Sequence, residues 1–312
     1  MYRLLKRSPP RALPRLLVSN EISGIAAGLA AASIWGGALA MTRLGVAAGG
    51  EQTGALGLHD MVLLRFLPPA ALLAPIGWRV VVRLGRTEWL RLLMLVAGGG
   101  APFLLIAGAG LREAGVAQAG ALLPGTVPLW VAAASMLASH GAVRLGAVQG
   151  LGLGMIVAAV VVTAGPALVA GEGWQGPALL LCASWLAALY TLTLRGAGIS
   201  ALEATAVVSL LSMLGFAPLY LTVLEPGLGA VGWGHIAGQL AWQGVLSGLL
   251  APTAFAFAVA RVGAARAASF GALSPAAASG FGLALLGEWP DFGASLGLLA
   301  AIVGVALAAR PR

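Results

Sequence analysis

Charged side chains are scarce in this sequence. They make up 9% of its 312 residues, whereas 60% of the residues are apolar. A soluble domain of this length needs far more charge to cover its surface. Lipid must therefore be the solvent for most of the chain.

Cysteine and lysine are almost absent as well. Cys182 has no second cysteine in the chain with which to form a disulfide, so the sequence says nothing about redox compartment. Lys6 is the single lysine, and the formal charge of +8 comes from arginines that lie between apolar runs. Basic residues placed in this way indicate membrane topology and exclude a nucleic-acid-binding face.

Ten apolar segments are long enough to cross a bilayer, because about 20 residues of helix span its hydrocarbon core. We expect an all-α membrane protein whose spans lie near 22–42, 61–78, 92–111, 114–138, 146–168, 174–194, 204–224, 239–260, 267–287 and 292–309. A basic arm, residues 1–21, precedes them. The apolar run at 22–42 that follows the arm is too long for the core of a signal peptide, so we interpret this run as an uncleaved first span.

The basic residues predict the orientation of the spans. With the N-terminus inside, fifteen of the eighteen lysines and arginines fall on the inner side, while Arg43 and Arg112 lie outside. Cytoplasmic loops keep such residues. Both termini are therefore predicted to be cytoplasmic, in a bacterial inner membrane.

The two halves of the sequence resemble one another. Ala32-Ser33-Ile34-Trp35 is answered by Ala183-Ser184-Trp185, and Ala101-Pro102 by Ala251-Pro252, about 150 residues later. We assign residues 22–168 and 169–312 to two five-helix repeats. An odd number of spans inverts the second copy, and inverted repeats are typical of secondary transporters with a site near the bilayer midplane.

Candidate cavity residues follow from depth in the spans. Proline breaks a helix at membrane depth where the backbone lines a cavity, and aromatic and polar side chains near the midplane are candidates for contact with a solute. The residues so predicted to line a substrate cavity are Trp35, Pro102, Gln118, Pro124, Trp130, Ser184, Trp185, Tyr190, Pro252, Ser274 and Pro275. Each of the aromatic residues is equally compatible with simple helix packing.

Charged residues inside or beside the spans are functional candidates of a second kind. Arg65 lies within the second span, about one turn from its outer side, and an ionisable residue there has a functional or a snorkelling role. Arg43 and Glu288 lie at outer ends of spans. We assign a gating or structural role to these three residues.

Short motifs in order along the chain carry a resemblance. The first half has Trp35-Gly36, Arg65-Phe66 and the run from Ala119 to Pro128. The second half has Arg266-Ala267-Ala268-Ser269, Pro275, Gly287-Glu288 and the run from Gly297 to Gly304. Over about residues 22 to 309 the chain resembles the EamA family of the drug/metabolite transporter (DMT) superfamily, which has ten helices in two inverted EamA repeats.

The resemblance implies a cavity lined by spans 1, 3, 4, 6, 8 and 9, and solutes such as amino acids, sugars, nucleotide derivatives or drugs. One motif departs from it, because Ser139-His140-Gly141 stands where the first repeat of such proteins has a glutamate that closes span 4.

Other function classes fit the sequence less well. An intramembrane enzyme needs polar catalytic groups at depth, but the spans hold neither an H-E-x-x-H motif nor paired aspartates, and His59, His140 and His235 lie at span ends. We expect no catalytic residue, metal or cofactor. A sensory or structural membrane protein, or a channel, is an alternative.

We predict that the halves rock about an apolar cavity and export a small zwitterionic or uncharged solute, such as an amino acid or related metabolite. Sugars, nucleosides and drugs are alternative solutes. The predicted partners are the lipid bilayer and the solute, with a proton or a counter-solute as candidates for coupling.

Overall fold

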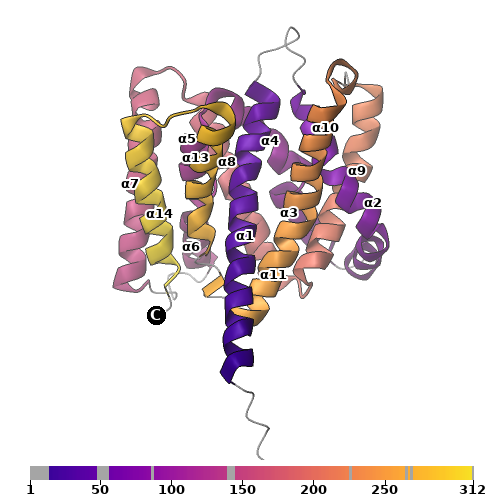
Figure 1. Ribbon diagram of the computed structural model, residues 1–312, viewed down its shortest axis with the longest axis horizontal. Helices are drawn as coiled ribbons and strands as arrows, with labels where there is room; N and C mark the ends of the chain where they lie inside the picture. The colour runs from indigo at the N-terminus through magenta and orange to yellow at the C-terminus, as the bar shows by residue number, and fades with distance from the viewer. Residues whose placement is uncertain are drawn as a thin grey trace, which may run out of the picture.

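A computed structural model describes residues 14–47, 56–85, 88–138, 145–224, 227–263, 266–267 and 270–310. Every regular element within these ranges is helical, and the helices form one bundle (Figure 1). The predicted all-α class is confirmed. Most of the basic arm, the Ser139-His140-Gly141 segment and the Ala268-Ser269 pair lie outside the described residues.

The helices follow the ten predicted spans, which we number 1 to 10. Eight are long and apolar enough to cross a membrane, and two shorter apolar helices form spans 9 and 10. Their bounds are α1 Pro14–Ala47; α2 Leu58–Leu84; α3 Trp89–Gly99 with α4 Ala101–Glu113; α5 Val116–Leu122 with α6 Val127–Ala138; α7 Ala147–Ala170; α8 Gln175–Gly196; α9 Ala201–Thr222; α10 Trp233–Gln239 with the π-helix η2 Leu240–Leu250 and α11 Ala251–Val262; the 3-10 turn η3 Gly271–Leu273 with α13 Ser274–Leu286; and α14 Phe292–Ala308.

Span 1 begins earlier than the sequence predicts. The helix starts at Pro14 and therefore includes the last residues of the predicted arm. Proline is tolerated in the first turn of a helix, where its missing N–H has no intrahelical partner, and Leu16, Leu17 and Val18 continue the apolar run. α1 consequently projects beyond the rest of the bundle (Figure 1).

Helices of one half pack mainly against helices of the other. Span 1 packs against spans 8 and 9, and span 6 packs against spans 3 and 4. Span 2 packs against span 7, span 5 against span 10, and span 4 against span 9. If each span is replaced by its equivalent in the other half, so that span 1 becomes span 6 and span 6 becomes span 1, the same set of contacts is obtained.

Small residues allow the closest of these approaches. A Cβ at Gly304 in span 10 would lie 2.8 Å from the carbonyl oxygen of Gly152 in span 5, and a Cβ at Gly77 in span 2 would lie 2.7 Å from that of Ala206 in span 7. Helix association within lipid depends on such backbone approach because burial of apolar surface contributes little there.

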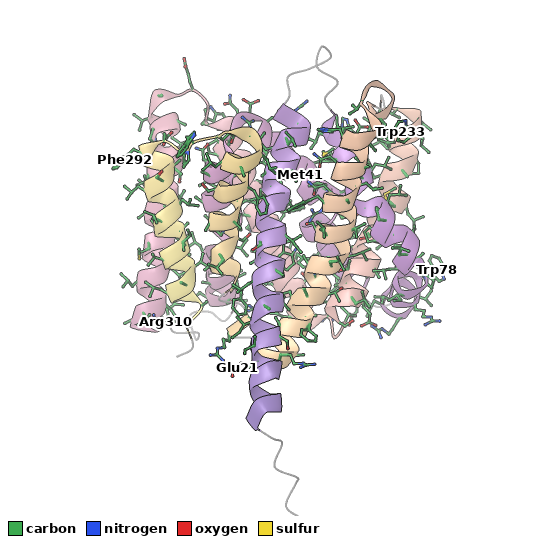
Figure 2. All side chains as sticks on the ribbon, in the orientation of Figure 1. Glu21, Met41, Trp78, Trp233, Phe292 and Arg310 are labelled. Atoms are coloured by element: carbon green, nitrogen blue, oxygen red, sulfur yellow. The ribbon has the colours of Figure 1, made fainter. Side chains whose placement is uncertain are left out.

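The two ends of the bundle are identified by residues labelled in Figure 2. Glu21 and Arg310 lie at the end where the chain starts and finishes, and Trp233 and Phe292 lie at the opposite end (Figure 2). We call these the terminal end and the far end. At the terminal end Arg266 pairs with Glu21, and Arg83 pairs with Glu203 at 3.1 Å.

Five exposed tryptophans lie near the ends of the spans. Their side chains are exposed by 44% to 85%, in keeping with a place at the membrane–water interface. They are Trp78, Trp89, Trp174, Trp233 and Trp289.

Candidate functional site

Four spans depart from the α-helix at their prolines. Span 3 breaks at Gly100, whose φ and ψ of −104° and −152° end α3 just before Pro102. Pro124 lies in the turn that separates α5 from α6. In span 8 the π-helix η2 gives way to α11 beside Pro252, and in span 9 the turn η3 gives way to α13 beside Pro275. These are spans 3, 4, 8 and 9, the equivalent pairs of the two halves.

Span 1 brings Trp35 to the interface between the halves. The ring centroid of Trp35 lies 5.6 Å from that of Phe255 in span 8. Next to it, a Cβ at Gly36 would lie 2.6 Å from the carbonyl oxygen of Ser274 in span 9. The start of α13, which holds Ser274 and Pro275, is therefore in direct contact with the middle of α1.

A second aromatic pair lies on the same side of span 1. The indole Nε1 of Trp242 in η2 donates to the carbonyl oxygen of Ile34 at 3.3 Å, and its ring meets Phe281 of α13 edge to face at 5.2 Å. Spans 1, 8 and 9 thus share an aromatic interface that the sequence alone does not predict.

Arg65 is the centre of a polar network between spans 1, 2 and 8. Its Nη1 donates to Oε1 of Gln243 at 2.8 Å and to Oγ of Ser247 at 2.9 Å. Nε2 of Gln243 donates in turn to Oγ1 of Thr42 at 2.9 Å and to the carbonyl oxygen of Ala38 at 3.2 Å. Gln243 and Ser247 are buried, whereas Arg65 is partly exposed.

Gln239 extends this network toward the far end. Its Nε2 donates to the carbonyl oxygen of Met41 at 2.8 Å, on the part of α1 inside the bundle (Figure 2). Its side chain is fully buried, yet Oε1 has no hydrogen-bond partner within the described part of the chain. Gln239, Gln243 and Ser247 stand at every fourth residue of span 8.

Arg43 and Glu288 meet at the far end. Nε of Arg43 lies 2.9 Å from Oε1 of Glu288, and its Nη1 donates to the carbonyl oxygens of Leu111 and Arg112 at 2.6 Å and 2.7 Å. Oε2 of Glu288 accepts from the backbone N–H of Val116 at 2.9 Å. This cluster, which we call the far-end latch, joins the last part of span 1 to the ends of spans 3 and 9 and the start of span 4.

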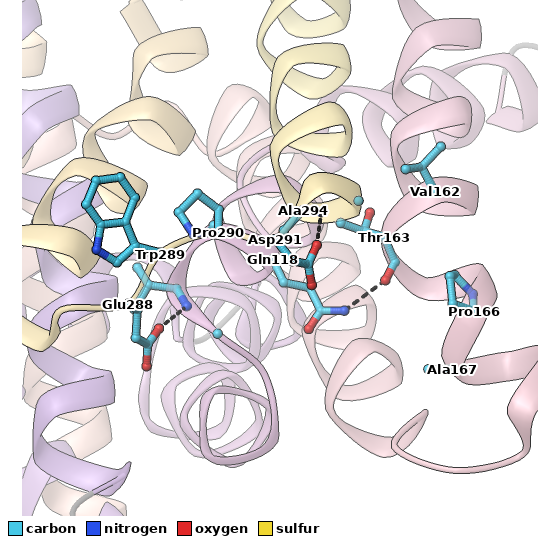
Figure 3. A pocket seen from close by; sticks show the side chains of 14 residues that line it. Gln118, Val162, Thr163, Pro166, Ala167, Glu288, Trp289, Pro290, Asp291 and Ala294 are labelled. Atoms are coloured by element: carbon cyan, nitrogen blue, oxygen red, sulfur yellow. Dashed lines mark hydrogen bonds between the residues drawn. The ribbon is translucent and has the colours of Figure 1, made fainter.

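A cavity of about 330 Å³ opens beside the latch (Figure 3). It is bordered by the start of α5, the last part of α7 and the segment from Glu288 to Ala294. Nε2 of Gln118 donates to the carbonyl oxygen of Thr163 at 2.9 Å within it, and Asp291 caps α14 by accepting from the N–H of Ala294 at 2.7 Å. Of the predicted site residues, Gln118 and Glu288 line this cavity.

Ser184 and Tyr190 hold spans 3, 4 and 6 together. The buried Ser184 hydroxyl accepts from Thr126 at 2.7 Å, next to the break in span 4. Tyr190 lies against Gly99, where a Cβ would come within 2.9 Å of the tyrosine ring. Both residues therefore lie at interfaces between helices.

The remaining predicted residues lie apart from these clusters. Nε1 of Trp130 is buried and has no hydrogen-bond partner among the residues described. Trp185 is 50% exposed, and Pro102 is exposed as well. The structure therefore gathers some of the predicted residues around spans 1, 8 and 9 and leaves others elsewhere, and their contact with a solute stays a prediction.

Asp60 occupies a place that the sequence does not suggest. From sequence it belongs with the acidic residues of the outer loops, but its side chain is buried in the first turn of α2. It accepts from the N–H groups of Gly57 and Gly227 at 2.7 Å and 3.2 Å and from the hydroxyl of Tyr220. Asp60 thus joins span 2 to span 7 at the far end.

Sequence reasoning missed the polar face of span 8. Gln239, Gln243 and Ser247 are dispersed in an apolar run, and their four-residue spacing is the signal that could have found them. Nothing in the sequence distinguishes Thr42 from other threonines in membrane helices. Its hydroxyl donates to the carbonyl oxygen of Ala38 in the same helix, which is the usual arrangement for a threonine in such a helix.

Comparison with known proteins supports the family resemblance in the second half. Residues 174–310 match the family model described as the EamA-like transporter family. No curated protein matches the chain. A crystal structure described only as that of a protein is similar in fold, with 20% sequence identity and a TM-score of 0.56, over 93% of this chain and 97% of the other.

Proposed function

We propose that this protein, in which residues 174–310 match the EamA-like transporter family model, is a secondary transporter of a small organic solute. The observation that carries the proposal is the set of helix contacts between the halves, together with the broken helices in spans 3, 4, 8 and 9. A transporter role accounts for both features, whereas an enzyme or a purely structural protein requires neither.

The contact pattern supports two inverted repeats. Span 1 contacts spans 8 and 9, and its equivalent in the second half, span 6, contacts the equivalent spans 3 and 4. The contacts 2–7, 4–9 and 5–10 each join two equivalent spans. Each half has five spans, so equivalent helices run in opposite directions. An axis in the membrane plane relates such halves, and rocking one against the other exposes a central site to each side in turn.

The charge distribution supports an orientation with the terminal end in the cytoplasm. Arginines such as Arg83, Arg91 and Arg266 lie at this end, where the positive-inside rule places them. The membrane proposed is the bacterial inner membrane. Export, from the terminal end to the far end, is the direction we propose.

The far-end latch is the proposed outer gate. Its ion pair joins residues 245 positions apart and connects helices that belong to different halves. When the halves rock, span 1 must separate from span 9 at this end, and the pair must break. The side chains of Arg43 and Glu288 are 20% and 28% exposed, so water can replace the lost contacts at moderate cost.

The interface of spans 1, 8 and 9 is the proposed wall of the solute path. Trp35 and Phe255 offer apolar surface, and Arg65 and Gln243 offer hydrogen bonds at a depth of about 10 Å from the start of α2, since Arg65 is two turns into that helix. A largely apolar wall with a few polar groups suits a small amino acid or a related metabolite.

Uptake into proteoliposomes tests the proposal. Purified protein would be reconstituted and offered labelled amino acids, sugars, nucleosides and cationic drugs, with and without a pH gradient and with unlabelled solute inside. Saturable uptake that is accelerated by internal solute is expected for one class. Flux that does not saturate would indicate a channel, and absence of flux across all classes with folded protein would contradict transport.

A further inference from the structure

Only one of the three nitrogens of the Arg65 guanidinium group donates hydrogen bonds to neighbouring residues that the structure describes. A guanidinium group carries five N–H donors, and those of Arg65 for which the structure shows partners belong to Nη1 alone. Nε and Nη2 have no hydrogen-bond partner in the described part of the chain. At this depth lipid offers no replacement, so unfilled donors carry a cost unless something else binds them.

The charge of Arg65 is also without a counter-charge. Four ion pairs are present among the described residues, and none of them includes Arg65. Its two partners, Gln243 and Ser247, are neutral. Charged residues inside membrane proteins are normally paired or serve a substrate or ion path, so the missing anion must come from outside the described chain or be absent.

Gln243 and Ser247 fix the guanidinium in place. Gln243 is held by Thr42 and Ala38 of span 1, so its Oε1 faces Arg65 in a set direction. Gly248 lets span 2 approach, because a Cβ there would lie 3.2 Å from the carbonyl oxygen of Arg65. The network thus orients one edge of the guanidinium by hydrogen bonds and leaves Nε and Nη2 open.

Gln239, on the face of span 8 that also carries Gln243, is another polar group without a full set of partners among the residues that the structure describes. Its Oε1 is buried and has no partner within the described residues, and it lies one turn from Gln243 toward the far end. The wall between spans 1, 2 and 8 therefore offers open donors at Arg65 and an open acceptor at Gln239.

We propose that Arg65 binds the carboxylate of the transported solute through Nε and Nη2, which makes the solute class a small apolar carboxylate such as an α-amino acid. The planar guanidinium matches a carboxylate in a bidentate pair, and Gln243 and Ser247 act as positioning residues that hold it ready. This inference rests on the proposed transport function and adds the solute's chemistry to it.

Binding can be measured without relying on transport. Thermal unfolding of the purified protein in detergent would be followed with four probes, L-leucine, L-phenylalanine, 4-methylpentanoate and phenylacetate, each beside the primary amide in which an uncharged carboxamide replaces the carboxylate. We expect at least one carboxylate to stabilise the wild type and its amide to fail. Equal stabilisation by acid and amide, or no response to any carboxylate, would overturn the proposal.

Variants of Arg65 separate recognition from folding. Arg65→Gln is expected to weaken carboxylate binding by about tenfold or more, and Arg65→Lys to weaken it less, because a lysine keeps the charge and loses the bidentate geometry. Arg83→Gln, at the exposed terminal end, is the matched control and should bind as the wild type does. Unchanged carboxylate binding by a folded Arg65→Gln variant would contradict the site.

Counterflow in proteoliposomes distinguishes this inference from the function on which it rests. Saturable flux of the amides without flux of the acids would support a transporter and refute the carboxylate site. Carboxylate binding that depends on Arg65 but is never accompanied by flux would support the site and refute transport.

Discussion

Two arginines inside or beside the bundle show how differently the same side chain can be held. Arg43 at the far end meets a carboxylate and two carbonyl oxygens. Arg65, deeper between spans 1, 2 and 8, meets one amide oxygen and one hydroxyl. The first is paired in charge and joins helices, whereas the second is positioned by neutral groups and keeps donors open. Their partners, more than their depth, distinguish a gate residue from a binding residue.

The largest effect on stability is expected at Arg43. Arg43→Gln leaves Glu288 without its counter-charge and three oxygens without their donor, and should lower the free energy of unfolding by about 1–3 kcal/mol, since the pair is partly exposed. Thermal unfolding followed by tryptophan fluorescence measures this change. Arg65→Gln is the matched comparison, because it removes an unpaired charge from lipid depth, and its melting temperature should stay the same or rise. A larger loss for Arg65→Gln would reverse our assignment of the two residues.

A substitution that places a carboxylate beside Arg65 should give this arginine a counter-charge, as Glu288 does for Arg43. Gln243→Glu places an anion where Oε1 of Gln243 now accepts, and it is expected to raise stability by about 1–2 kcal/mol. It should also weaken carboxylate binding, because the new anion neutralises the guanidinium and repels a second carboxylate. Unfolding and probe binding would be measured on the same preparation. Val245→Leu, at an exposed position of the same helix, is the control. A variant that binds the acids as tightly as the wild type would contradict the assignment of Arg65 as their ligand.

The latch should show energetic coupling between its two residues. In a double-mutant cycle of Arg43→Gln and Glu288→Gln, the double variant is expected to be more stable than the sum of the single losses predicts, with a coupling of about 1 kcal/mol. Additive losses would mean that the 2.9 Å contact contributes little and that the outer gate depends on other groups.

The smallest effect is expected for an arginine at the terminal end. Arg83 pairs with Glu203 at 3.1 Å, but its side chain is 53% exposed, so Arg83→Gln should change the free energy of unfolding by about 0.5 kcal/mol or less and leave uptake unchanged. A loss as large as that of Arg43→Gln would show that charge removal itself, and not the latch, destabilises the protein.

The sequence predicted the features that depend on local pattern. Apolar runs identified all ten spans, because their length against the bilayer is a property of each segment alone. The prolines of spans 3, 4, 8 and 9 marked real departures from the α-helix, because proline removes a backbone donor wherever the helix packs.

Features that depend on packing between distant segments were not predictable. Arg43 and Glu288 were each singled out, but nothing local to either residue shows that they meet across 245 positions. In the sequence Asp60 resembles a charged residue of a loop, but in the structure it accepts hydrogen bonds from Tyr220 and Gly227. The polar face of η2 was not predicted, because its role depends on hydrogen bonds to Arg65 and Thr42, which lie far away in the sequence.

The central claim is that the far end, closed by the latch, opens during the transport cycle. It can be tested by spin-label distance measurements in a Cys182→Ser background, with one label in each half, at positions 168 and 233, whose side chains are 62% and 85% exposed. Position 233 lies at the far end, and position 168 follows the residues of α7 that border the cavity beside the latch. We expect two distance populations whose ratio changes when a transported carboxylate is added, and a shift toward the longer distance in Arg43→Gln. A single population that responds neither to solute nor to loss of the latch would contradict the account.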